Sequence, residues 1–209
     1  MKELTPTVYI VDDDNGVRSS IRVLMKSVNL PAAAFASAQE FLSAYNPTQA
    51  GCVILDIRMP GMSGLELQEA LNESGAVIPV IFITGHGDVP MAVEAMRHGA
   101  FDFLQKPFRD QDLIDRVQQA LARDRETREG LREHGKIRAR IASLTPRELE
   151  VLDLLTIGKA NKMMARDLGL SQRTVEIHRA HVMEKMGAKS VAQLVRMVMD
   201  LKASEAARP

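Results

Sequence analysis

The stretch Val8-Tyr9-Ile10-Val11-Asp12-Asp13-Asp14 joins a short apolar run to three consecutive carboxylates. Apolar residues then recur at spacings of four, three and four residues, at Val17, Ile21, Leu24 and Val28, which is the period of an amphipathic helix. The sequence here predicts a buried strand and then a helix, with acidic side chains at the turn between them.

The alternation of strand and helix continues outward from this stretch, five times in all between Thr7 and Leu121. Apolar runs predict strands at 8–11, 32–35, 52–55, 80–83 and 101–104. Helical spacing predicts helices at 17–28, 38–45, 65–72, 90–97 and 110–121. Five such units predict a parallel sheet with helices on both faces, which binds ligands at the carboxyl ends of its strands.

Length and composition indicate two packed domains. The chain has 209 residues, of which 45% are hydrophobic and 26% charged, and this composition excludes a disordered or low-complexity chain. Its apolar runs are far shorter than the roughly 18 residues of a membrane span, and its first residues lack a secretory signal. The single Cys52 has no partner for an internal disulfide. We therefore expect a cytoplasmic protein without a membrane partner.

The net charge of zero conceals two opposite halves. Residues 1–124 carry 16 acidic and 10 basic side chains, whereas residues 125–209 carry 11 acidic and 17 basic ones. An acidic half suits a cation site, and a basic half suits a polyanion such as DNA. Two ordinary solvated surfaces would give the same balance, so charge alone assigns no function.

The second half of the chain has helical patterns and no strand signal. Charged residues dominate 123–143, where Gly130 and Gly135 each cost a helix about 1 kcal/mol relative to alanine, and we expect a charged, partly helical linker. This linker would separate a first domain, 1–122, from a second domain, 144–209. Thr145-Pro146-Arg147-Glu148 is a helix start signal, and helices are expected near 146–157, 161–168, 172–186 and 191–198.

Side chains of complementary chemistry follow the expected strands of the first domain. They are Asp12, Asp13, Asp56, Thr84 and Lys106. Two carboxylates about 4 Å apart repel each other by roughly 4 kcal/mol at an effective dielectric of 20, so such a group must protonate, hold a lysine or bind a cation. A hard divalent ion such as Mg²⁺ is the simplest solution. Asp14 is expected at the surface or as a helix N-cap.

Four motifs surround these positions. They are Val11-Asp12-Asp13, Leu55-Asp56-Ile57-Arg58-Met59-Pro60-Gly61-Met62-Ser63-Gly64, Thr84-Gly85-His86-Gly87-Asp88 and Lys106-Pro107-Phe108. Together they resemble the receiver domain of bacterial two-component response regulators over residues 6 to 122. The resemblance implies a five-stranded, doubly wound α/β fold of the CheY or flavodoxin kind.

The resemblance also implies a role for each residue of the acidic site. Asp56 would accept a phosphoryl group from a sensor histidine kinase. Asp12 and Asp13 would hold Mg²⁺ together with Asp56 and the main-chain carbonyl of Arg58. The remaining implied roles are binding of phosphoryl oxygens by Thr84 and Lys106 and an aromatic switch at Phe103. Phosphoryl transfer requires positioning and charge neutralisation more than covalent help, which a metal, a lysine and a hydroxyl around one carboxylate can supply.

The basic half contains a helix, a glycine-bearing turn and a second helix between Asn161 and Val175, as in a helix-turn-helix. On the expected helix 172–186, Val175, Val182 and Met186 share one face, which should pack. The block from Leu144 to Met186 resembles the four-helix DNA-binding domain of the NarL, LuxR and FixJ group. Its spacing from a receiver is most like that of the FixJ branch.

This second resemblance divides the DNA-facing side chains into two sets. Those near DNA phosphates would be Lys162, Thr174, Arg179, Lys185 and Lys189. Those facing the major groove would be Arg173, Glu176, Ile177 and Ala180, where a glutamate can accept from cytosine and an arginine can donate to guanine. His178 is either a packed histidine bonded to backbone or a DNA contact. Core positions are expected for Met163, Met164, Met183 and Met197.

The whole chain is thus expected to be a phosphorylation-activated transcriptional regulator. The resemblance implies that phosphorylation pairs two copies through a surface near Met91, Val93 and Phe101, and that the pair binds double-stranded promoter DNA and RNA polymerase. The chain would catalyse its own phosphorylation and dephosphorylation without being a turnover enzyme.

Two other functions would use similar residues. A metal-dependent phosphatase with an aspartyl nucleophile would need an Asp-x-Asp nucleophile and acid pair directly after the first strand and usually a cap domain. Here the third Asp is adjacent, no cap domain fits, and a basic helical domain follows. A receiver used only for protein interaction would work without phosphate, and the intact acidic site argues against it. A Mg²⁺ titration separates this alternative, because such a module would bind no metal.

Overall fold

A computed structural model of the chain describes residues 5–85 and 89–206. The chain divides into two compact units, Met1–Glu129 and Gly130–Pro209. Within the described ranges, no helix is long and apolar enough to cross a membrane. The segment His86-Gly87-Asp88, which contributes to the receiver resemblance, lies outside the described residues.

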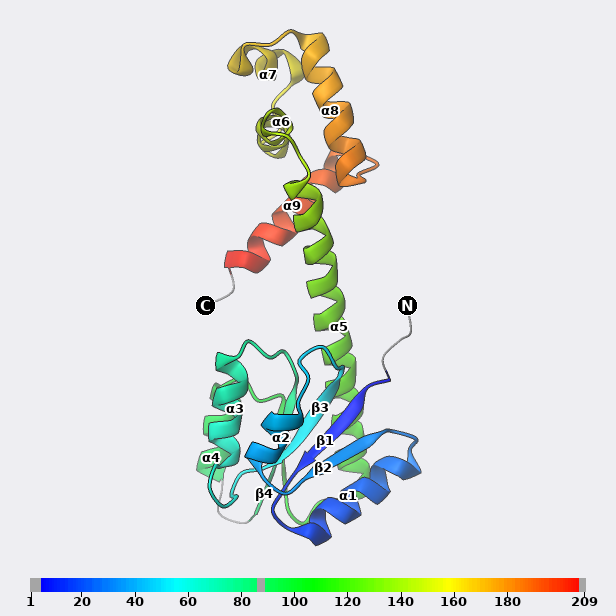
Figure 1. Cartoon of the computed structure of the whole chain (residues 1–209), viewed down its shortest axis with the longest axis vertical. Coiled ribbons are helices and arrows are strands. Elements are labelled where there is room, and N and C mark those ends of the chain that lie inside the picture. The colour runs from blue at the N-terminus through cyan, green and yellow to red at the C-terminus, as the bar shows by residue number, and fades with distance from the viewer. Residues whose placement is uncertain (1–4, 86–88, 207–209) are drawn as a thin grey trace. The chain divides into compact units, whose positions relative to one another are not determined.

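The first unit is built on a five-stranded parallel sheet in the order β2-β1-β3-β4-β5 (Figure 1). The strands are β1 (Thr7–Val11), β2 (Ala32–Phe35), β3 (Gly51–Asp56), β4 (Val80–Thr84) and β5 (Asp102–Gln105). The helices are α1 (Asn15–Ser27), α2 (Ala38–Ala44), α3 (Gly64–Glu73), α4 (Val89–Arg97) and α5 (Asp110–Ala142). The expected doubly wound fold is confirmed, and the strand order reverses between β1 and β3, where such sheets bind their ligands.

Alternate residues of the strands build two apolar layers. Helices α2, α3 and α4 cover one face of the sheet, where Val53, Leu55 and Phe82 are fully buried. Helices α1 and α5 cover the other face, around Cys52 and Ile54. Because β3 is buried on both faces, its sequence is a continuous apolar run and does not alternate with polar residues.

Glycines lie at the first residue of β3 and the first residue of α3. At both positions another backbone segment lies too close to leave room for a side chain. A Cβ on Gly51 would lie 2.0 Å from the carbonyl oxygen of Thr7, and one on Gly64 would lie 2.2 Å from that of Asp56. Any other residue would therefore displace neighbouring backbone. The close approach at Gly64 keeps the start of α3 directly beside the end of β3.

The sequence pattern predicts that helix α5 ends at Leu121. In the structure the helix continues to Ala142, through most of the segment expected as a linker. The reason is a set of buried polar contacts. Asp124 accepts a hydrogen bond from the Gly51 N–H at 3.0 Å and pairs with Arg128 at 2.8 Å, and its side chain is 1% exposed. Arg128 also donates to the Pro47 carbonyl at 2.8 Å. These contacts attach about two further helical turns to the first unit. The division between the units falls inside 123–143.

The second unit packs four helices with the last part of α5. They are α6 (Pro146–Thr156), α7 (Asn161–Leu168), α8 (Gln172–Met186) and α9 (Val191–Ala206). Thr145 and Glu148 form the expected capping box at the start of α6. Gly169, at φ +67°, makes the tight turn between α7 and α8. Ile137 of α5 is buried in the core of this unit, so part of the expected linker belongs to the domain that follows it.

The methionines of the second unit follow the prediction at three of four positions. Met164 is buried, and Met183 and Met197 pack against the core. The expectation for Met163 is wrong, because its side chain is 46% exposed. Helix α7 turns Met164 and Ala165 inward, and the preceding residue points about 100° away from that face.

Candidate functional site

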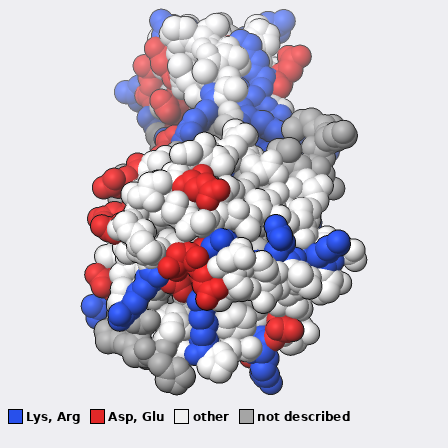
Figure 2. All heavy atoms as spheres, turned by 60° about the horizontal axis from the view of Figure 1, so that its bottom comes forward, with Lys and Arg blue, Asp and Glu red and all other residues white. Residues whose placement is uncertain are grey.

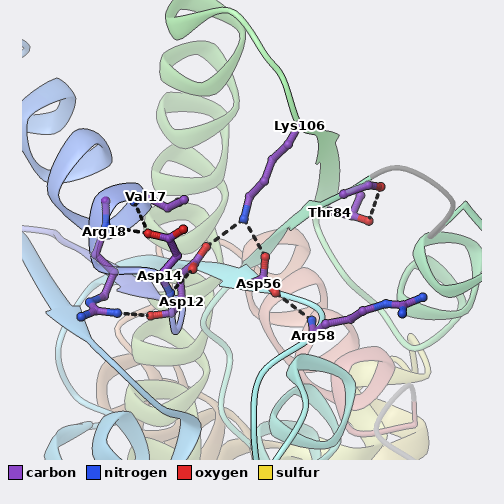
Figure 3. A network of polar contacts seen from close by, with 10 residues as sticks. Asp12, Asp14, Val17, Arg18, Asp56, Arg58, Thr84 and Lys106 are labelled. Carbon is purple, nitrogen blue, oxygen red and sulfur yellow. Dashed lines mark hydrogen bonds and ion pairs between the residues drawn. The ribbon is translucent and has the colours of Figure 1, made fainter.

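The acidic site lies at the carboxyl ends of the central strands. The register between β1 and β3 brings their last residues together, so Asp12 and Asp56 are at the same edge of the sheet. Thr84 is the last residue of β4, and its carbonyl accepts a hydrogen bond from the Lys106 N–H at 2.7 Å. Figure 3 shows these side chains, which come from four separate strand ends, around one small space.

The Lys106 ammonium joins the two buried carboxylates of this site. Its Nζ lies 2.7 Å from Asp56 Oδ1 and 3.0 Å from Asp12 Oδ2. The Asp12 side chain is 1% exposed, that of Asp56 13% and that of Lys106 29%. The Asp12 carboxylate is thus shielded from water, whereas the Asp56 carboxylate remains partly exposed.

Burial and hydrogen bonding act in opposite directions on these groups. Burial raises the pKa of Asp12 above its usual value, although hydrogen bonds from Lys106 and from the Asp14 N–H oppose the rise. Burial alone would lower the pKa of Lys106, but its hydrogen bonds to Asp56 and Asp12 outweigh that effect and raise the pKa. Lys106 therefore remains a cation between the two carboxylates.

The second carboxylate oxygen of Asp56 is held by backbone. The Arg58 N–H donates to Asp56 Oδ2 at 2.8 Å, and the Arg58 side chain points away from the carboxylates in Figure 3. The Gly64 N–H in turn donates to the Ile57 carbonyl at 2.9 Å and closes the loop after β3. Both oxygens of Asp56 therefore have fixed directions before any reactant arrives.

The donor set of this site fits a hard cation. Among residues 5–85 and 89–206, no three His, Cys, Asp or Glu side chains are gathered closely enough to form a metal cluster by themselves. Asp12 and Asp56 nevertheless supply two carboxylates, and Asp13, which follows Asp12 in the chain, is exposed. Mg²⁺ prefers one or two carboxylates completed by waters and phosphate oxygens. The role of the Arg58 carbonyl and the occupancy by Mg²⁺ stay predictions.

Thr84 and Phe103 lie on the same face of adjacent strands. Thr84 is 3% exposed, and its hydroxyl is within 3.2 Å of the Gly85 carbonyl. The register pairs Phe82 with Phe103, and both side chains belong to the layer covered by α4. A movement of Thr84 would therefore change the space available to the Phe103 side chain.

Two contacts near Asp12 were not anticipated from the sequence. Asp14 is the N-cap of α1, as expected, since its side chain accepts from the Gly16 and Val17 N–H groups. Its own N–H also donates to Asp12 Oδ1 at 2.8 Å, and Arg18 donates to the Asp12 carbonyl at 2.6 Å. The N-cap was readable from sequence, whereas these two contacts depend on how the turn folds back.

Acidic side chains also gather on one face of the molecular surface (Figure 2). Figure 2 brings the lower end of Figure 1 forward and shows acidic side chains gathered at the middle of that face, with Lys and Arg side chains beside them. Such a surface attracts a cation or a cation-bearing reactant.

Helix α8 presents the face that the sequence predicts for DNA. The exposed set comprises Arg173, Glu176, Ile177 and Ala180. The buried set comprises Val175, Val182 and Met186. An isoleucine that is 48% exposed amid polar residues suits a contact with a thymine methyl group. His178 is half-buried, and among the described residues its Nδ1 has no hydrogen-bond partner, so the expected bond to backbone is not formed through this atom.

The cations expected at DNA phosphates fall into two groups. Lys162 and Lys189 are exposed. Arg179 instead donates to Asn161, and Lys185 pairs with the buried carboxylate of Glu148 at 2.7 Å. Thr174 bonds to Ser171 within the first turn of α8, at 2.8 Å between hydroxyls.

The carboxyl group of Glu148 depends on this partner. The hydrogen bond from Lys185, followed by one from the Thr145 N–H, lowers the pKa of Glu148 from 4.5 to about 2. Lys185 therefore ties α8 to the start of α6, a role that the spacing of 37 residues hides from sequence analysis.

Comparison with known proteins supports both domains. Residues 8–118 match the response regulator receiver domain, and residues 142–198 match the luxR family of bacterial regulatory proteins. The chain is 48% identical to nodulation protein W of Bradyrhizobium diazoefficiens, over 91% of this chain and 84% of that protein. It is 49% identical to the transcriptional regulatory protein FixJ of Azorhizobium caulinodans, over 95% of this chain and 94% of that protein. The structure of response regulator StyR aligns with a TM-score of 0.84 and 44% identity, over 93% of this chain and 98% of that one.

Proposed function

The chain belongs to the bacterial response regulators that join a receiver domain to a luxR-family DNA-binding domain, and on that basis we propose Asp56 as its phosphoryl acceptor and α8 as its DNA-reading helix. It is a phosphorylation-activated transcription regulator with relatives in the FixJ branch, not a metabolic enzyme.

One observation carries the assignment of the acceptor: the Lys106 ammonium lies between the carboxylates of Asp56 and Asp12. A carboxylate oxygen of Asp56 attacks phosphorus, a new P–O bond forms, and the bond from phosphorus to the kinase histidine nitrogen breaks with its electron pair leaving on nitrogen. Lys106 and the Thr84 hydroxyl offer donors to the phosphoryl oxygens, so negative charge is neutralised where it accumulates.

Asp12, Asp13 and Asp56, with the Arg58 carbonyl, are the groups that would hold Mg²⁺. When bound, the ion neutralises charge on the phosphoryl oxygens and helps to align the reactant. The burial of Asp12 supports this proposal, because a desolvated carboxylate gains from a second cation.

Mass spectrometry of the intact chain tests the acceptor. Incubation with acetyl phosphate and Mg²⁺ should add one phosphoryl group to the wild type and none to Asp56→Asn, and EDTA should prevent the addition. Asp115→Asn is the matched control, because Asp115 is exposed on α5, away from the acidic site, and should label normally. Undiminished labelling of Asp56→Asn would place the acceptor elsewhere. If the chain neither labels nor binds Mg²⁺ in a titration, it is a receiver that works by protein interaction alone.

DNA binding through α8 is tested by separating charge from base recognition. Lys162→Ala or Lys189→Ala should weaken binding to all duplexes alike and reduce the slope of log affinity against log salt by about 0.9, because one counterion fewer is released. Arg173→Ala or Glu176→Ala should relax base preference, by about 1–3 kcal/mol for each lost bidentate contact. Unchanged preference in both latter variants would place the reading face elsewhere.

The proposed partners follow from the two domains. A sensor histidine kinase supplies the phosphoryl group, two phosphorylated copies pair, and the pair binds promoter DNA and RNA polymerase. We place these events in the cytoplasm and assign to the receiver its own dephosphorylation. The exposed apolar side chains Val93 and Met96 on α4 support pairing through that helix.

A further inference from the structure

We infer that Arg140, at the end of α5, positions the DNA-reading helix by capping the carboxyl end of α8, and thereby sets the sequence preference of DNA binding without touching DNA. The inference rests on the proposed role of α8. It concerns only the second unit, to which both helix ends belong. Figure 1 shows these ends near each other.

The capping contact is direct. Arg140 Nη1 donates to the Met186 carbonyl at 3.0 Å, and the side chain is half-buried. A Cβ built on Gly187 would lie 3.4 Å from the Arg140 Cζ and Nη1 atoms, so the guanidinium packs flat over this glycine. Gly187 has φ +64°, which a residue with a side chain adopts only with strain.

This contact satisfies a group that the helix leaves open. The last carbonyls of a helix have no partner inside it. At the end of α8, the Gly187 N–H donates to Glu184 and the Ala188 N–H donates to Met183. Arg140 supplies a donor for Met186, and its charge is favourable at the negative end of the helix dipole.

The part of α5 that carries Arg140 is itself held in place. Ile137, one turn earlier on α5, is 3% exposed in the core of the unit. Lys185, in the last turn of α8, pairs with Glu148 of α6. The carboxyl end of α8 is therefore bound to α5 and to α6. These two contacts fix the position of α8 along its axis and its rotation about that axis.

The position of α8 matters because hydrogen bonds to DNA bases tolerate only small displacements of the side chains that make them. The α8 residues of the reading face lie up to about four turns from this end, and a productive contact must be held within about 0.5 Å. Releasing the end lets α8 shift along its axis or rotate. Base-specific contacts are then lost, whereas contacts to the regularly repeating phosphates adapt.

The test measures two affinities of the full-length chain. The probes are a duplex that the wild type selects from a randomised library and a scrambled duplex of the same composition. Arg140→Gln should lower the ratio of selected to scrambled affinity about tenfold, comparable to losing one base contact, with the salt slope unchanged. Arg140→Lys should restore most of the ratio, since an ammonium can donate to the same carbonyl. Gly187→Ala, which leaves every charge in place, should reproduce the loss.

Arg138→Gln is the matched control, because Arg138 lies two residues away and pairs with the exposed Glu205. An equal effect in this control, or equal weakening on both duplexes with a smaller salt slope, would overturn the inference in favour of a simple charge or phosphate contact. A lower active fraction with an unchanged ratio would overturn it in favour of stability alone. If Glu176→Ala loses preference and Arg140→Gln does not, the inference fails and the proposed α8 face stands. If neither loses it, the α8 face itself is wrong.

Discussion

At the scale of single residues, Glu148 shows how a partner determines the behaviour of a carboxyl group. Its pKa of about 2 lies below the ordinary 4.5 because Lys185 and the Thr145 N–H bond to the ionised form. A lowered pKa in the folded state means that ionisation favours folding. This contribution is complete above about pH 4.5 and disappears as the pH falls through about 2.

Glu148→Gln should remove this pH dependence while keeping an oxygen to cap Thr145. We expect the variant to melt below the wild type at pH 6–7, and the difference to shrink steadily between pH 4.5 and 2 in melts followed by circular dichroism. Glu150→Gln is the control, because Glu150 pairs with an exposed Arg147 at 2.8 Å and should show a small difference. A constant gap between wild type and Glu148→Gln at all pH values would contradict the assigned pKa.

Residues of the acidic site were predictable because a strand end is a local signal. Asp12, Asp56 and Lys106 each follow an apolar run, and parallel strands bring their ends to one edge. Lys185 and Arg179 were not predictable in the same way. Both carry the positive charge expected of a DNA contact. Their partners inside the domain, however, lie on other helices, and no sequence periodicity reveals such pairs.

At the scale of elements, α5 marks the limit of sequence patterns. After Leu121 the apolar period fades and Gly130 and Gly135 disfavour a helix, so the pattern indicates a linker. Tertiary contacts override this local preference. Asp124 reaches the start of β3, and Ile137 enters the core of the second unit, so both parts of α5 are stabilised from outside the helix.

Removing the charge of Asp124 should loosen the start of β3. Asp124→Asn leaves the half-buried Arg128 without its counterion, and the loss of one partner costs up to about 3–5 kcal/mol in a fully buried pair. We expect much faster hydrogen exchange at the Gly51 amide and lower resistance to urea.

Glu133→Gln is the matched control on the same helix, because its pair with Lys136 at 3.0 Å is exposed and contributes at most about 1 kcal/mol. Equal exchange rates at the Gly51 amide in Asp124→Asn and in this control would contradict the prediction. They would show that the part of α5 after Leu121 does not stabilise the start of β3.

At the scale of the whole molecule, the proposed pairing of two phosphorylated copies can be tested on helix α4. Val93 and Met96 of α4 are 47% and 40% exposed, and α4 covers the face on which Thr84 and Phe103 lie. A phosphoryl group that draws Thr84 inward would give Phe103 room and reshape this surface. Sedimentation velocity should therefore detect a dimer when beryllofluoride and Mg²⁺ are added, and none with Asp56→Asn.

Val93→Asp should prevent this pairing without preventing phosphorylation, because it places a charge in the apolar contact. Val23→Asp serves as control, since Val23 is equally apolar, 68% exposed and located on α1. If the wild type stays monomeric while its DNA affinity rises, pairing is not the switch.

The buried Cys52 makes the unaltered chain its own reporter. It is the one cysteine of the sequence, it lies in β3 with the proposed acceptor Asp56, and burial raises the pKa of its thiol. A maleimide should therefore react with it only in molecules whose sheet has opened, slowly in buffer and rapidly in concentrated urea. Its alkylation rate therefore reports how often β3 becomes accessible to solvent. New cysteines placed on the surface will accept dyes or spin labels without removal of the native thiol.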